Sequence, residues 1–264
     1  MSQRVYTGGY ADAGRGPGRL VSALPWLLAG VTILLQIAYP LTEEGSRTSL
    51  TTATVVAFFL ASASHAWIHR GVAWTLGYLL ITLGGGLAIE AIGVRTGWPF
   101  GDYDYSDALQ PQLLGVPVII PLAWAMMAYP ALVVARRLTR NWLLIPVFGA
   151  WALASWDLFL DPMMVAEGYW VWTGNATDFP GLDGIPAVNL LGWAGTAFVM
   201  MLLLDRLGRR RADDRQPAML YLWTYVGGVV ANAVFLDRPT VALVGGIGMG
   251  LVAVPFAIAL WRAR

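Results

Sequence analysis

The stretch that decides the fold is residues 240–260, TVALVGGIGMGLVAVPFAIAL, in which 21 consecutive residues carry no charge. A helix rises about 1.5 Å per residue, so a run of this length crosses the roughly 30 Å hydrocarbon core of a bilayer. Seven other runs share this character: Leu20–Leu41, Leu50–Ile68, Ala73–Gly93, Leu113–Ala135, Trp142–Leu160, Pro186–Leu204 and Ala218–Leu236. The sequence therefore predicts an all-α bundle of about eight membrane-spanning helices, because backbone that faces lipid must hydrogen-bond within its own helix.

The composition indicates the same class of protein. Of the 264 residues, 57% are hydrophobic and only 12% are charged, which is too few charges to cover a water-soluble domain of this length. Cysteine is absent, which excludes disulfides and thiolate metal ligands. All 17 basic residues are arginine, so Schiff-base catalysis by lysine is excluded as well.

The arginines predict how the bundle is oriented. With eight spans, 14 of the 17 arginines fall on one side, and only Arg47, Arg95 and Arg238 fall on the other. Because basic residues concentrate in cytoplasmic loops, we expect both termini in the cytoplasm. Residues 1–19, rich in glycine and arginine, are expected to form a disordered cytoplasmic tail, and residues 20–264 a single transmembrane domain.

Four polar side chains lie at a similar depth near the predicted outer ends of the spans. Glu90, Asp157 and Asn189 fall within the spans, and Asp161 follows directly after the fifth. The spacing of Asp157 and Asp161 puts both carboxylates on one helical face, about 6 Å apart along the axis. Ionisable residues are costly in a membrane and are therefore functional candidates. Structural interpretations remain open, since Asp161 before Pro162 can simply end a helix, and Glu90 or Asp157 can bond to a neighbouring helix.

Aromatic residues gather around these acids. Two long outer loops, residues 94–112 and 161–185, are rich in acidic and aromatic side chains, and loops of this length usually have a function. The candidate substrate-binding residues are Asp102, Tyr103, Asp104, Tyr105 and Trp172 in the loops, and Trp124, Trp156 and Trp193 in the spans. His65 and His69 have an i, i+4 spacing that can bind metal, but they fall at the cytoplasmic end, and we predict no metal site.

Several ordered blocks of sequence resemble one family. They are Glu90, GWPFGDYDY at residues 97–105, LGVP at 114–117, PLAW at 121–124, DLFLDP at 157–162, YWVW at 169–172, GIPAVN at 184–189, and Gly192-Trp193. Together, over about residues 80–195, they resemble the CruF-type carotenoid hydratases of prokaryotic membranes, a group that includes bisanhydrobacterioruberin hydratases and carotenoid 1,2-hydratases.

The resemblance implies addition of water to the terminal C=C bond of an acyclic C40 or C50 carotenoid, which gives a tertiary alcohol. It also implies a prokaryotic cell membrane as the location, and the orientation predicted from the arginines puts the active site near the extracytoplasmic face. The expected partners are the carotenoid in the bilayer and water, with no nucleic acid, no metal and no other cofactor. The sequence leaves open which carotenoid is the substrate, whether one or both ends react, and the oligomeric state.

The residues suit this chemistry, because protonation of an alkene needs a carboxylic acid that keeps its proton near neutral pH. Burial in an apolar pocket and a second nearby carboxylate both favour the protonated form. We expect Asp157 to be the acid, Asp161 or Glu90 to support it or to activate water, and Asn189 to hold the water. Electron-rich aromatic faces would stabilise the cation.

Three other functions remain open. A membrane prenyltransferase would use the DxxxD pattern of residues 157–161 to bind Mg²⁺ and diphosphate, although these acids fall on the side poorest in arginine. A carotenoid cyclase would make the same cation but close a ring, which leaves the mass unchanged. A carotenoid-binding or transport protein would leave the carotenoid chemically unaltered.

Overall fold

The structure is a computed structural model, which describes residues 19–210 and 212–263. Within these residues, eight helical stretches are long and apolar enough to cross a membrane, as the sequence predicts. The α-helices are α1 (Arg19–Ala38), α2 (Glu44–Arg70), α3 (Val72–Leu79), α4 (Gly85–Thr96), α5 (Ile119–Leu138), α6 (Leu144–Ala154), α7 (Asp157–Ala166), α8 (Ala187–Arg206), α9 (Arg215–Val230) and α10 (Pro239–Trp261). A 3₁₀ turn, η1 (Tyr39–Leu41), follows α1. The predicted tail falls almost entirely outside the described residues, and the cytoplasmic location of the termini stays a prediction.

Three of the spans are built from more than one helical segment. The third joins α3 to α4 through a π-helix, η2 (Leu80–Gly84), and the seventh continues α9 into another, η3 (Ala231–Phe235). The fifth consists of α6 and α7, which meet at Ser155 and Trp156. Short π-helical segments inside α-helices are often found at functional sites, so η2 and η3 mark candidate functional regions.

Three span boundaries differ most from the prediction, and the first of them is the start of the second span, at Glu44 and not at Leu50. The fourth span begins at Ile119 and not at Leu113, because residues 112–117 form a small hairpin before the helix. The fifth continues through Pro162 to Ala166, so the interpretation of Asp161–Pro162 as a helix end is wrong. Proline removes one N–H from the helix, but the segment after it still makes helical hydrogen bonds, such as the one from the Glu167 amide to the Met163 carbonyl at 3.1 Å.

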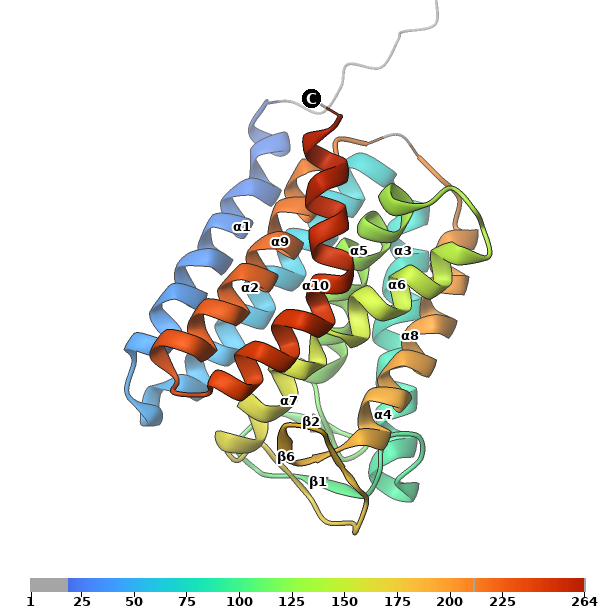
Figure 1. Cartoon of the computed structure of the whole chain (residues 1–264). Helices are drawn as coiled ribbons and strands as arrows, with labels where there is room; N and C mark the ends of the chain where they lie inside the picture. Colours follow the sequence, from blue (N-terminus) through green and yellow to red (C-terminus); the bar gives the residue numbers. More distant parts are fainter. Residues whose placement is uncertain (1–18, 211, 264) are drawn as a thin grey trace, which may run out of the picture.

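The two long loops fold into three small antiparallel sheets, which the sequence did not predict. The strands are β1 (Tyr103–Tyr105) paired with β4 (Trp170–Trp172), β2 (Gln112–Leu113) with β3 (Val116–Pro117), and β5 (Asp178–Phe179) with β6 (Leu182–Pro186). Figure 1 shows β1, β2 and β6 gathered at one end of the helical bundle, opposite the C-terminal end of α10. We call residues 97–118 and 167–186 the loop cover.

Helix α5 forms the centre of the bundle. Every residue from Ala123 to Ala135 is buried, as expected for a helix that is apolar on all sides and surrounded by others. Glycines on α10 allow close packing against α7: an added Cβ at Gly245 would lie 2.5 Å from the Phe159 ring, and one at Gly248 would lie 2.3 Å from Leu158. This contact holds α7 close to the bundle.

A polar network closes the end of the bundle opposite the loop cover. Arg70 is buried, donates from Nε to the Tyr129 hydroxyl at 3.2 Å, and forms an ion pair with Asp214. Both ring nitrogens of His65 are engaged, Nδ1 with the Tyr129 hydroxyl and Nε2 with the Asp213 carbonyl, each at 2.8 Å. This network joins α2 and α5 to the segment before α9.

Candidate active site

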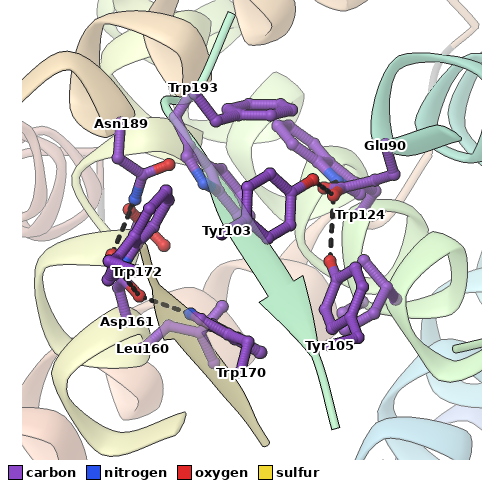
Figure 2. Close-up of a pocket in the computed structure, with 14 residues that line it drawn as sticks. Glu90, Tyr103, Tyr105, Trp124, Leu160, Asp161, Trp170, Trp172, Asn189 and Trp193 are labelled. Atoms are coloured by element: carbon purple, nitrogen blue, oxygen red, sulfur yellow. Dashed lines mark hydrogen bonds between the residues drawn. The ribbon is translucent and has the colours of Figure 1, made fainter. Parts of the chain in front are cut away.

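The three carboxyl groups and the amide singled out in the sequence line one pocket beneath the loop cover (Figure 2). Its cavity volume is about 40 Å³, which is enough for water. The lining residues are Glu90, Phe100, Tyr103, Tyr105, Ile120, Ala123, Trp124, Asp157, Leu160, Asp161, Trp170, Trp172, Asn189 and Trp193. We call this cavity the acid pocket.

Glu90 accepts three hydrogen bonds from side chains on two other elements. Its Oε2 accepts from the hydroxyls of Tyr103 at 2.7 Å and Tyr105 at 2.9 Å, and its Oε1 accepts from Trp124 Nε1 at 2.9 Å (Figure 2). Burial, together with the nearby Glu90 charge, raises the pKa of Tyr103 and of Tyr105, so both keep their protons and act as donors. Three donors aimed at one carboxyl group favour its ionised form.

Two glycines on α4 make this arrangement possible. An added Cβ at Gly86 would lie 3.2 Å from the Trp124 ring, and one at Gly93 would lie 2.7 Å from the Tyr103 hydroxyl. The absence of side chains therefore lets both aromatic residues approach the helix that carries Glu90.

Asn189 joins the other two carboxyl groups. Its Nδ2 donates to Asp157 Oδ2 and to Asp161 Oδ2, each at 2.8 Å. Both amide hydrogens are thereby used, and Figure 2 shows the amide oxygen of Asn189 pointing away from Asp161. That oxygen is the atom left to hold water or substrate.

The two aspartates differ in the number of donors they meet. Asp161 Oδ1 accepts from Trp170 Nε1 at 2.7 Å and from Trp172 Nε1 at 3.2 Å, in addition to the bond from Asn189 to Oδ2. Asp157 accepts only from Asn189, and its buried Oδ1 has no hydrogen-bond partner among the described residues. Asp157 therefore carries the one carboxyl oxygen of the three acids that is both buried and free.

The β1–β4 pair explains which loop residues reach the pocket. Tyr103 lies opposite Trp172, and Tyr105 lies opposite Trp170. Side chains alternate along a strand, so these four share the face that lines the pocket, while Asp104 between the tyrosines is exposed on the other face.

Two predicted binding residues consequently lie away from the pocket. Neither Asp104 nor Asp102 is part of its lining. Asp102 is exposed and lies against two glycines of the loop cover, where an added Cβ at Gly97 would meet its Oδ1 at 2.3 Å and one at Gly174 its Oδ2 at 3.0 Å. Asp102 therefore packs the loop cover and does not face the acids.

Tryptophan rings form the wall of the pocket nearest α8. The Trp124 and Trp193 rings stack with centroids 3.9 Å apart, and Trp156 meets Trp193 edge to face at 6.1 Å. Trp156 itself lines an adjoining cavity. Of the eight predicted binding residues, the structure brings five to the acid pocket: Tyr103, Tyr105, Trp124, Trp172 and Trp193.

Sequence reasoning missed Trp170 and Phe100 as pocket residues. The alternation in YWVW at residues 169–172 is the signal that identifies Trp170, because Trp170 and Trp172 must share one face of a strand. In the described part of the chain, no group of three or more His, Cys, Asp or Glu side chains is arranged to hold a metal ion.

Fold and site together define a multi-pass helical membrane protein whose loops close a pocket of acids and aromatic rings over the end of the bundle. Comparison with known proteins gives the family. The model of the carotenoid biosynthesis protein family matches residues 49–255, and the chain belongs to that family. The resemblance to CruF-type carotenoid hydratases is thereby confirmed.

A curated relative agrees with this assignment. The chain is 32% identical over 182 residues to a bisanhydrobacterioruberin hydratase of Haloarcula japonica. The match covers 62% of this chain and 58% of the relative, so it spans less than two thirds of the relative's length. No solved structure matches the chain.

Proposed function

We propose that this protein is a carotenoid hydratase that adds water to the terminal C=C bond of an acyclic carotenoid. The observation that carries the proposal is the free, buried Oδ1 of Asp157 in a pocket walled by aromatic rings. The activity in the relative's name, bisanhydrobacterioruberin hydratase, supports the same reaction, and conversion of bisanhydrobacterioruberin to bacterioruberin is one instance of it.

In the proposed reaction, Asp157 supplies the proton. The terminal double bond takes this proton at its CH carbon, and the positive charge develops on the carbon that bears two methyl groups. Asp157 suits this role because one donor contacts its carboxyl group, whereas three contact each of the other two acids. Fewer donors stabilise its ionised form less, so a proton is held there at lower cost.

The surrounding rings and carboxylates stabilise the cation. Aromatic faces attract positive charge, and the stacked Trp124 and Trp193 rings lie in the pocket wall. Glu90, with its three donors, supplies a fixed negative charge. Hydrogen bonds to both oxygens of Glu90 make its carboxylate a poorer nucleophile toward the cation.

Water then attacks the cation and completes the addition. Asn189 Oδ1 can accept a hydrogen bond from this water, and the Asp157 carboxylate, which has just given up its proton, receives the proton that the water loses. Asp161 supports this step by holding the amide that it shares with Asp157. The product is a tertiary alcohol, which contains all the atoms of the alkene and of one water molecule. Return of this proton to the Asp157 carboxylate restores the acid.

Expression in a host that makes an acyclic carotenoid, followed by mass spectrometry of the pigments, tests the proposal. We expect a product heavier than its precursor by one water, and, in D₂O, one deuterium bound to carbon for each hydration. An unchanged mass with altered retention would indicate a cyclase, and release of diphosphate that depends on Mg²⁺ would indicate a prenyltransferase. Bound but unaltered pigment would indicate a binding or transport protein. Any of these three outcomes would overturn the proposal.

A further inference from the structure

A second and larger cavity lies beside the acid pocket. Its volume is about 460 Å³, within the range of small-molecule sites, and its walls come from α1, η1, α2, α5, α7, α9 and η3. Side chains such as Ile37, Val55, Phe159 and Met163 make it predominantly apolar. We call this cavity the chain chamber.

The chain chamber and the acid pocket are neighbours. They share four lining residues, Ile120 and Ala123 of α5, Leu160 of α7 and Trp170 of β4. An acyclic carotenoid is much larger than the 40 Å³ of the acid pocket, so most of its chain must lie outside that pocket when the end group reacts. The chamber is the apolar space that continues from the pocket.

Three buried polar atoms in the chamber lining have no hydrogen-bond partner among the described residues, the hydroxyl of Tyr39, Thr54 Oγ1 and Asn232 Oδ1. Asn232, in the π-helix η3, is 3% exposed and lines the chamber, and its Nδ2 donates to the Gly228 carbonyl at 2.9 Å. Because a carbonyl can only accept, this bond fixes which end of the amide is nitrogen. The other end, Oδ1, is buried and has no hydrogen-bond partner among the described residues.

Such an acceptor is costly unless something satisfies it. A buried polar atom without a partner costs stability, and most have one. Thr54 Oγ1, on α2 in the chamber lining, is likewise buried and has no partner in the described part of the chain. A purely hydrocarbon ligand would leave Asn232 Oδ1 unsatisfied, whereas a hydroxyl group on the ligand can donate to it.

We propose that the chain chamber binds the chain of the carotenoid substrate, and that Asn232 Oδ1 accepts a hydrogen bond from a hydroxyl group already present on that chain. The inference rests on the proposed function, because the acid pocket defines which end of the molecule reacts. The protein thus binds an acyclic carotenoid that carries a hydroxyl group more tightly than the corresponding hydrocarbon. An earlier hydroxylation or hydration must therefore supply its preferred substrate.

The test measures binding separately from hydration. Full-length protein in lipid nanodiscs is titrated with an acyclic carotene hydrocarbon or with its monohydroxylated derivative, and quenching of tryptophan fluorescence gives Kd. Trp156, Trp170 and Trp223 line the chamber, so a polyene bound there should quench them. We expect the Kd of the hydroxylated ligand to be roughly 3- to 10-fold lower than that of the hydrocarbon, which corresponds to the net free energy of one hydrogen bond.

Two variants and one control locate the site. Asn232→Leu removes the acceptor at similar volume and should abolish the preference for the hydroxylated ligand. Gly227 lines the chamber, and an added Cβ there meets only the Trp223 ring, at 3.7 Å, so the chain can accommodate a larger side chain at this position. The side chain of Gly227→Leu should therefore occupy space in the chamber and raise the Kd of both ligands by at least about tenfold. Gly195→Leu, on α8 and with nothing within 4 Å of an added Cβ, is the control that should change neither Kd.

Each outcome decides between the two proposals. An unchanged Kd for both ligands in Gly227→Leu would show that the chain chamber is not the binding site. A retained preference for the hydroxylated ligand in Asn232→Leu would show that the Asn232 amide does not recognise the hydroxyl group. Neither result contradicts the hydratase proposal. Wild-type binding with the expected preference but without any hydrated product would support the chamber and overturn the proposed function. If Gly227→Leu retained less phospholipid than the wild type but bound carotenoid with the same Kd, the chamber would be a lipid site. This result would also overturn the inference.

Discussion

Replacing each aspartate of the acid pocket by asparagine should separate chemistry from structure. Asp157 accepts one hydrogen bond through Oδ2, and its Oδ1 has no partner among the described residues. In Asp157→Asn, the new side-chain oxygen can keep the hydrogen bond from Asn189, and the new NH₂ group can take the place of Oδ1, where it meets no other donor. Asp161 accepts on both oxygens. The same isosteric change is therefore tolerated at the first position and costly at the second.

The cost at Asp161 follows from the chemistry of its partners. An indole N–H can only donate, and Trp170 and Trp172 both donate to Oδ1. The new NH₂ group of Asp161→Asn must face either these two indoles or the Nδ2 of Asn189. A buried donor that meets donors costs about 1–3 kcal/mol, and we expect a loss of that size in the free energy of unfolding.

For Asp157→Asn we expect a loss of activity without a matching loss of stability. Removing a general acid typically lowers a rate by about 10²–10⁴-fold, which corresponds to about 2.7–5.5 kcal/mol in the barrier. Hydration is followed by chromatography and mass spectrometry of extracted pigments, and stability by thermal unfolding of the purified protein. Hydration by Asp157→Asn within about tenfold of the wild-type rate, at equal protein level, would refute the assignment of Asp157 as the acid.

Two other pairs of variants test how the site and the bundle are held. An added Cβ at Gly192 would lie 2.7 Å from the carbonyl oxygen of Pro99, so Gly192→Ala should displace the loop cover and lower the hydration rate by at least about tenfold. Gly195→Ala, on the same helix, should leave the rate unchanged because nothing lies within 4 Å of an added Cβ there. Equal hydration rates in the two variants would contradict this prediction. Arg70 pairs with Asp214 and has only 5% of its side chain exposed, so Arg70→Gln should lower the midpoint of thermal unfolding by an amount equivalent to about 1–3 kcal/mol. The side chain of Arg215, which pairs with Asp213, is 80% exposed, so Arg215→Gln should leave the midpoint unchanged. Equal midpoints would show that the Arg70 pair does not stabilise the bundle.

The sequence predicted the bundle and the depth of the acids because both follow from one-dimensional patterns. Apolar runs of about 20 residues give the spans, and the positions of Glu90, Asp157 and Asn189 within those runs give their depth. The orientation in the membrane stays a prediction. These inferences need no knowledge of which helix touches which.

The hydrogen bonds of the site required tertiary structure. Strands β1 and β4 are three residues long and 64 residues apart in sequence, and their register alone decides that Tyr105 faces the pocket while Asp104 does not. No local pattern in either loop reveals the other as its partner. The number of donors on each carboxyl group, which distinguishes Asp157 from Asp161 and Glu90, depends on that register.

In the proposed mechanism, the difference in hydrogen-bond donors gives different roles to acids of similar burial. Glu90, Asp157 and Asp161 are all at most 4% exposed, so burial alone does not distinguish them. Tyrosine and tryptophan donors fix two of the carboxyl groups, and the third keeps one oxygen free toward the pocket. An alkene has no lone pair and gives little directional attraction to its acid, so the protein must hold the donor oxygen ready and exclude competing bases. Environments that separate the protonation of neighbouring carboxyl groups achieve this in other enzymes, and here the separation comes from the indoles and phenols of the loop cover and α5.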